Sequence, residues 1–199
     1  MKIIPVFLSG EQVRLEPLSR DHVDQLCEVG IDEELWKVTM TQIRSRDDMA
    51  AYVRTAIEEE TNGTSLPFVV ISKGDGKVVG STRYSNIDHT NRRLEIGWTW
   101  IATAWQRTAV NTETKFLLLR HAFEVLGCIR VEFKTDSINE KSRAALVRIG
   151  AKEEGIFRNH MITPSGRIRH SAYYSIIDSE WSAIKRDLEK KLLRNNSAS

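Results

Sequence analysis

Between residues 93 and 150 the chain changes twice from the spacing of a strand to the spacing of a helix. Apolar and polar side chains alternate over residues 94–100, and a helical stripe of apolar residues follows over about residues 112–126. Residues 130–136 alternate again, and a second helical stretch begins after Asn139 and ends at Gly150. This order predicts an α/β fold in which a parallel pair of strands, joined by a crossover helix, lies within a mixed sheet.

The flanking segments extend the same sheet. We expect strands over residues 13–18, 68–71, 78–84, 154–161 and 168–177, with helices after Ser19, after Ser45 and over residues 181–193. The complete order is β-α-α-β-β-β-α-β-α-β-β-α. With 199 residues and no long linker, the chain is expected to form a single domain over residues 1–199, with its core over about residues 13–179.

Composition argues against several classes of function. The 29 basic and 27 acidic residues nearly cancel, so the charge favours neither a nucleic-acid partner nor a membrane surface. No run approaches the roughly 20 apolar residues that span a bilayer, and residues 1–8 do not read as a secretion signal. Cys27 and Cys128 alone cannot form a disulfide framework or a zinc site. We therefore expect a cytoplasmic protein.

The join between the strand at residues 94–100 and the helix that follows is the segment most suited to chemistry. The first amides of a helix have no internal partner, and the helix dipole makes that end positive, so the join is suited to a phosphate group. Arg107 adds a positive charge, and Thr108, Asn111 and Thr112 add hydrogen-bonding groups. On spacing alone, an ordinary loop with a helix cap is the alternative.

Several short motifs stand in a fixed order along the chain. They are Glu-Ile-Gly-Trp at residues 95–98, Gln106-Arg107-Thr108-Ala109-Val110-Asn111, Thr112-Glu113, Asn-x-x-Ser-x-x at residues 139–144, Gly-Ala at 150–151 and Glu-Gly at 154–155. Together they resemble the GCN5-related N-acetyltransferase (GNAT) superfamily, whose signature loop reads Gln/Arg-x-x-Gly-x-Gly/Ala. Within it they resemble the branch of ribosomal-protein alanine N-acetyltransferases (Rim-type). The resemblance covers about residues 13–179.

The resemblance implies a fold and a co-substrate. The fold is a single-domain acyl-CoA N-acyltransferase, with a mostly antiparallel sheet, flanking helices and a splayed central pair of parallel strands. Acetyl-CoA is the implied co-substrate, no metal is required, and the acetyl group passes directly to a primary amine without a covalent intermediate. The implied cofactor-binding residues are the pyrophosphate cradle, two amides near the thioester and two residues of the helix after Asn139, namely Gln106, Arg107, Thr108, Ala109, Val110, Asn111, Thr112, Ile101, Ala102, Asn139 and Ser142.

Two residues carry the implied catalysis. Glu95 lies on the strand that flanks the thioester, where a carboxylate can take a proton from the acceptor ammonium. Its alternative is an exposed strand residue paired with Arg93 or Arg83. Ser142 is the implied proton donor to the departing thiolate, and its alternative is a solvated serine. Glu154 and His160 are the less favoured candidates for the base.

Other residues have both a functional and a structural interpretation. Asn139 is a good helix cap as well as a candidate ligand of the pantetheine arm. Trp98 and Trp100 are expected in the core. Trp36 is the better candidate for the acceptor side, and a basic cluster near the last hairpin is expected at the surface, comprising Arg158, Arg167 and Arg169.

Two departures from the family pattern leave alternatives open. Ala109 stands where the family has glycine, and Leu146 stands where many members have a tyrosine. An acyl-CoA-binding or regulatory module with little turnover is therefore one alternative, and an acetyltransferase of small molecules such as aminoglycosides or polyamines is another. The acceptor is either a small molecule or a protein N-terminus. The oligomeric state stays open, with a homodimer as one alternative.

Overall fold

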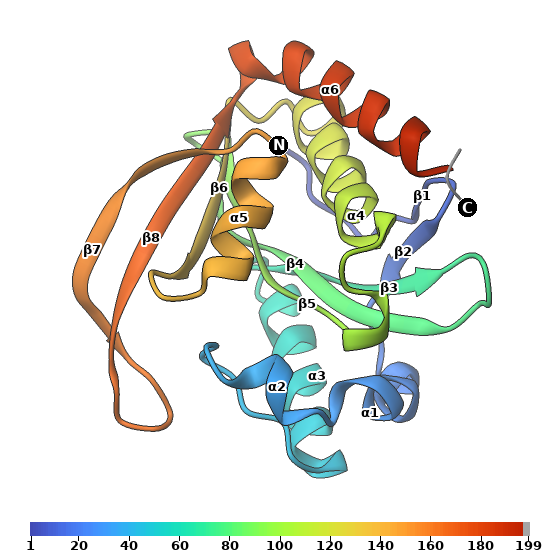
Figure 1. Ribbon diagram of the computed structural model, residues 1–199, viewed down its shortest axis with the longest axis vertical. Helices are drawn as coiled ribbons and strands as arrows, with labels where there is room; N and C mark the ends of the chain where they lie inside the picture. The colour runs from blue at the N-terminus through green and yellow to red at the C-terminus, as the bar shows by residue number, and fades with distance from the viewer. Residues whose placement is uncertain (197–199) are drawn as a thin grey trace.

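The computed structural model describes residues 1–196, which form one eight-stranded sheet with helices on both faces (Figure 1). The strand order is β1-β2-β3-β4-β5-β6-β8-β7. The strands are β1 (Leu8–Ser9), β2 (Val13–Pro17), β3 (Leu66–Ser72), β4 (Val78–Asp88), β5 (Arg93–Ile101), β6 (Arg130–Asp136), β7 (Lys152–Ile162) and β8 (Ile168–Ile177). The α-helices are α1 (Val23–Gly30), α2 (Glu33–Trp36), α3 (Arg46–Thr61), α4 (Ala109–Arg120), α5 (Glu140–Arg148) and α6 (Asp178–Asn196).

Two apolar cores hold the layers together. Helices α4, α5 and α6 cover one face of the sheet, and α1, α2 and α3 cover the other (Figure 1). The first core contains Leu118, Val131 and Leu188, and the second contains Leu26, Val53 and Trp100. Each helix turns its apolar stripe toward the sheet because burying that surface stabilises the fold by about 25 cal/mol per Å².

The parallel pair predicted from the sequence is present and confirms the fold class. Strands β5 and β6 are parallel, whereas every other strand pairing in the described chain is antiparallel. They pair at three positions, Arg93 with Arg130, Leu94 with Val131 and Glu95 with Glu132. Beyond these positions β5 stays with β4, while β6 continues beside β8 as far as Asp136. The sheet therefore opens after Glu95, and we call this opening the gap.

A bulge in β5 changes which side chains face the core. Ser81 opposes Trp100 and Arg83 opposes Gly97, so Thr82 opposes two residues, Trp98 and Thr99. Trp98 takes a φ of 53°, and its side chain is 44% exposed. The expectation that Trp98 is a core residue is therefore wrong, whereas Trp100 is buried as expected.

Trp36 also differs from its predicted role. It is buried in the core under α1–α3, its Nε1 donates to Gly30 O at 2.8 Å, and its ring lies 5.3 Å from that of Trp100. An indole held in this way packs the fold and is not exposed to an acceptor. The prediction that placed it at the acceptor side is therefore wrong.

Helix α4 begins earlier than its apolar stripe predicts. The structure starts it at Ala109 because Thr108 caps it, its Oγ1 accepting from Val110 N–H at 3.2 Å. After Arg120 the helix continues as one wider π turn over His121–Val125, and Gly127 follows it with a φ of 66°. The early start brings the helix N-terminus beside the end of β5.

The same helix anchors the N-terminal hairpin. The buried carboxylate of Glu113 accepts hydrogen bonds from the backbone N–H groups of Glu11 at 2.9 Å, Gln12 at 2.7 Å and Val13 at 2.7 Å. Gly10 is required beside it, because a Cβ there would lie 2.4 Å from the Glu113 Cδ atom. The β1–β2 turn and α4 are thus joined through one side chain.

Within the described residues, no helix combines the length and the apolar content needed to cross a bilayer.

Candidate active site

The loop between β5 and α4 ends in three consecutive backbone donors without a partner in the described chain. Ala102 N–H donates to Val79 O at 2.8 Å, and the N–H groups of Trp105 and Gln106 bond within the loop. The N–H groups of Arg107, Thr108 and Ala109 then remain unpaired. Three unpaired amides at a helix start are suited to an anion, so this geometry is compatible with the predicted pyrophosphate cradle, which stays a prediction.

Two details of the loop explain its shape. Gln106 Nε2 donates to Ile101 O at 3.0 Å, which ties the loop to the end of β5. Arg107 takes a φ of 62°, the left-handed conformation that turns the chain into α4. The N–H group of Ala102 already donates to Val79 O at the end of the strand. The prediction that this N–H group contacts the cofactor is therefore wrong.

The methyl group of Ala109 is compatible with this geometry. Ala109 is the first residue of α4 and is not one of the residues with a positive φ, so its backbone does not require glycine. We expect Ala109→Gly to leave affinity for acetyl-CoA within about twofold and to lower the free energy of unfolding by about 0.5–1 kcal/mol. Calorimetry and denaturant unfolding test the two parts. A large gain in affinity would show that the methyl group crowds the cradle.

Helix α5 brings its first turn and one basic residue to the same region. Asn139 Oδ1 accepts from Ser142 N–H at 3.0 Å and caps the helix. The cap leaves Asn139 Nδ2 and the Ser142 hydroxyl without a partner in the described part of the chain. Arg148 Nη2 donates to Thr112 Oγ1 at 3.3 Å, which places a second guanidinium beside the start of α4. Sequence reasoning missed Arg148, because its only signal was a basic residue at the end of the helix.

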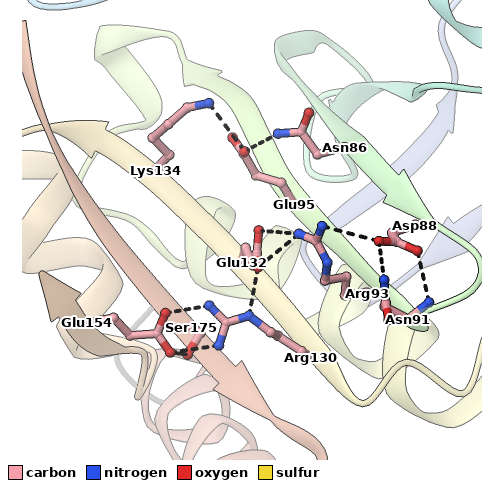
Figure 2. Close-up of polar contacts among 10 residues, drawn as sticks. All are labelled: Asn86, Asp88, Asn91, Arg93, Glu95, Arg130, Glu132, Lys134, Glu154 and Ser175. Carbon is pink, nitrogen blue, oxygen red and sulfur yellow. Dashed lines mark hydrogen bonds and ion pairs between the residues drawn. The ribbon is translucent and has the colours of Figure 1, made fainter. Parts of the chain in front are cut away.

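Glu95 is the last residue of β5 that pairs with β6, and it is buried. Its carboxylate accepts from Asn86 Nδ2 at 2.7 Å and lies 3.5 Å from Lys134 Nζ. Figure 2 draws both contacts as dashed lines. It pairs with neither Arg93 nor Arg83, so the alternative of an exposed strand residue is wrong. The chain thus holds one oriented carboxylate at the edge of the gap.

The neighbouring carboxylates form ion pairs of their own. Arg93 lies between Asp88 and Glu132, and Arg130 lies between Glu132 and Glu154 (Figure 2). The hydrogen bond from Arg130 lowers the pKa of Glu154 to about 2. A carboxylate with so low a pKa is a weak base, so Glu154 is a poor candidate for general base.

His160 stays a second candidate for the base. Its Nδ1 lies 3.0 Å from Ser171 Oγ. Burial lowers the pKa of His160, the charges of Lys134 and Arg169 lower it further, and the charge of Glu95 opposes them. The imidazole is therefore largely neutral at pH 7 and able to accept a proton.

The basic cluster predicted at the surface is partly buried. Arg169 is buried and its Nε donates to Ser171 Oγ at 3.1 Å, while Arg167 is ion-paired with the buried Asp136. The expectation of a solvated cluster is therefore wrong for Arg169, whereas Arg167 stays partly exposed, with its side chain 36% accessible. Arg158 is exposed and lines a hollow of about 800 Å³ on the β7–β8 arm.

Trp98 and Arg83 lie on the same face of the sheet as Glu95. The guanidinium of Arg83 lies between the ring of Trp98, at 4.7 Å, and the ring of Tyr52, at 4.6 Å. Arg83 also pairs with Glu59 at 2.9 Å. The face of the gap away from α4 thus carries an exposed aromatic ring near an oriented carboxylate.

A mixed sheet that opens between two parallel strands, with unpaired helix-start amides near the opening, defines an acyltransferase-type α/β protein. A family model described as an acetyltransferase (GNAT) domain matches residues 12–152. The chain therefore belongs to the acetyltransferase (GNAT) family.

Solved structures support this assignment. A GCN5-related N-acetyltransferase from Brucella melitensis has a TM-score of 0.90 and 34% identity, over 96% of this chain and 87% of that one. Mycobacterium smegmatis RimJ, solved in complex with CoA-disulfide, has a TM-score of 0.78 and 21% identity, over 94% of this chain and 92% of that one. Because the identity is low, the similarity to RimJ shows only that the two proteins share a fold.

A curated relative in Bacillus subtilis is named "Putative ribosomal N-acetyltransferase YdaF". It is 37% identical over 111 residues, which make up 56% of this chain. The match spans 60% of the length of that relative.

Proposed function

We propose that this protein is an acetyl-CoA-dependent N-acetyltransferase that passes the acetyl group directly to a primary amine. The observation that carries the proposal is the gap after Glu95, which has unpaired loop amides at the start of α4 and a buried carboxylate at its edge. This arrangement supplies both an anion site and a base along one opening in the sheet.

The residues present fit coenzyme A at the start of α4. We assign the pyrophosphate to the loop from Gln106 to Thr112, with the unpaired amides as donors and Arg107 and Arg148 as positive charges. Asn139 Nδ2 and the amide of Ile101 are the proposed ligands of the pantetheine arm. When bound, the co-substrate supplies an activated acetyl group.

The remaining roles concern protons. Glu95 takes the proton that the acceptor ammonium loses, directly or through water, and Ser142 gives a proton at the leaving side. A backbone N–H of the splayed strand β5 is the proposed donor to the oxyanion. Cys27 and Cys128 lie outside the loop and outside α5, which agrees with direct transfer and no covalent intermediate.

The acceptor class is a separate part of the proposal. The relative named as a ribosomal N-acetyltransferase supports testing ribosomal proteins and N-terminal peptides first. An acceptor-dependent assay of CoA release should compare these with aminoglycosides and polyamines. Turnover with peptides alone assigns a protein N-terminus, and turnover with polyamines or aminoglycosides alone assigns a small-molecule acetyltransferase.

A binding or regulatory module is the second candidate function, because Leu146 leaves α5 without the tyrosine that many family members use. Saturable binding of acetyl-CoA without turnover for any acceptor in the panel would favour this candidate over the enzyme.

The cradle predicts a specific loss of binding. Arg107→Glu reverses a charge beside the three unpaired amides, so we expect affinity for acetyl-CoA to fall at least tenfold, which is about 1.4 kcal/mol. Calorimetry on the wild type and the variant measures it. Arg186→Glu on α6 is the matched control and should leave affinity unchanged. Equal affinity in wild type and Arg107→Glu would move the phosphate site away from this loop.

A further inference from the structure

Lys115 lies on α4 at the gap, although nothing in the sequence motifs singles it out. Its side chain is 5% exposed. Nζ donates to Thr99 Oγ1 of β5 at 2.6 Å and lies 5.7 Å from the centre of the Phe133 ring on β6. Thr99 lies further along β5 than Glu95, which is the last residue of β5 that pairs with β6. The lysine therefore contacts both strands in the region where they diverge.

The ammonium group is poorly satisfied in this position. A protonated lysine has three N–H donors, and Thr99 Oγ1 is the single acceptor that the described chain gives to Lys115. That oxygen is shared with Thr82 Oγ1 at 2.7 Å. Among the described residues, no carboxylate lies within ion-pair distance of Lys115. A buried cation with one neutral partner is costly, and a methionine or leucine would pack α4 at lower cost.

The surroundings also set the charge of this group. The described elements around it present Thr82 on β4, Thr99 and Glu95 on β5, and Phe133 on β6, of which only Glu95 is charged. Burial lowers the pKa of Lys115 to about 7, and the charge of Glu95 opposes that shift. Near pH 7 the amine is therefore present in both protonation states. In the protonated state, two of its N–H donors have no acceptor among the described residues.

We propose that Lys115 is a hydrogen-bond donor to the acyl thioester that enters the gap. This inference rests on the acetyl-CoA function proposed above. In acyl transfer the negative charge develops first on the carbonyl oxygen and then on the sulfur. A donor fixed in a dry site stabilises such charge more than water does. Lys115 on α4 thereby supplies a hydrogen-bond donor that α5 does not, because α5 carries Leu146 where many family members have a tyrosine.

The first test follows the amine itself. In protein labelled with ¹⁵N-lysine, the Nζ signal of Lys115 is identified by its loss in Lys115→Met. We expect acetyl-CoA to shift this signal and raise the pKa of Lys115, whereas 3′,5′-ADP, which lacks the pantetheine arm, should leave both unchanged. Acetonyl-CoA keeps both the sulfur and a carbonyl oxygen, whereas CoA keeps the sulfur alone. A shift with acetonyl-CoA but not with CoA identifies the carbonyl oxygen as the accepting atom, and a shift with CoA identifies the sulfur.

The second test is kinetic. We expect Lys115→Met to lower kcat at least tenfold while KM for acetyl-CoA changes less than threefold, and Lys115→Gln, which keeps a neutral donor, to recover part of the loss. Lys185→Met on α6 is the control and should behave as wild type. A lysine that only packs the fold would alter stability and leave the ratio of kcat to KM as it was.

The outcomes separate the two proposals. If calorimetry shows no binding of acetyl-CoA to the wild type, the proposed function fails and this inference fails with it. If acetyl-CoA binds while the Lys115 signal stays fixed and Lys115→Met turns over normally, only the role of Lys115 is overturned.

Discussion

Replacing Glu95 by glutamine should lower turnover at least tenfold and leave affinity for acetyl-CoA nearly unchanged. Glutamine keeps an oxygen for Asn86 Nδ2 and the length of the side chain, but it removes the base beside the gap. A positioned base contributes about 10²–10⁴-fold, and most of the acceptor amine is protonated at pH 7. Raising the pH should therefore recover part of the loss, because more acceptor is then already neutral.

The control for Glu95→Gln is Glu154→Gln. Glu154 is exposed, ion-paired with Arg130 and, with a pKa of about 2, too weak a base to substitute for Glu95. Steady-state kinetics across pH 6–9 on the wild type and both variants makes the comparison. Unchanged turnover at neutral pH in Glu95→Gln would contradict the assigned role, and a fall in His160→Gln would then transfer it to the imidazole.

Replacing Glu113 by glutamine should lower the free energy of unfolding by about 2 kcal/mol. The Glu113 carboxylate accepts hydrogen bonds from three backbone N–H groups at the β1–β2 turn. A glutamine side chain places its NH₂ group, which is itself a donor, where one carboxylate oxygen now accepts from these N–H groups. A hydrogen bond to a charged group contributes about 1.5–3 kcal/mol, and a buried donor left unpaired adds a cost of its own. For a chain of this size the change corresponds to a fall in Tm of about 4–8 °C.

Glu28→Gln on the exposed side of α1 is the matched control for this measurement. Its free energy of unfolding should stay within about 0.5 kcal/mol of wild type, as for most surface substitutions. Denaturant unfolding of the wild type and both variants measures these free energies of unfolding. Equal stability of Glu113→Gln and Glu28→Gln would show that the turn does not depend on this carboxylate.

The parts of the site that were predictable are those built from neighbouring residues. The cap at Asn139 depends on one turn of chain, so residue type and spacing were enough to locate it, whereas α4 begins at Ala109, before its apolar stripe. The parallel pair followed from the order of strands and helices, which restricts the connection.

The parts that failed depend on pairing between distant segments. Strict alternation of side chains along β5 predicts that Trp98 faces the core, but the bulge that reverses this orientation forms only by pairing with β4. The partners of Glu95, which are Asn86 and Lys134, come from two other strands whose register the sequence does not disclose. Lys115 was missed for the same reason, since its acceptor lies 16 positions away on a different element.

The three-position contact between β5 and β6 divides the sheet into two unequal leaves. One leaf contains β1 to β5 and the other contains β6, β8 and β7. Among residues 1–196 the strands join the two leaves only from Arg93 to Glu95 and from Arg130 to Glu132. The apolar core beneath α4, α5 and α6 contains residues of both leaves, such as Leu94 and Val131, and supplies a further connection. A rotation of one leaf against the other would have its hinge at these three paired positions, where Figure 2 shows Arg93, Glu95, Arg130 and Glu132, and it would change the width of the opening while the ladders within each leaf stay intact.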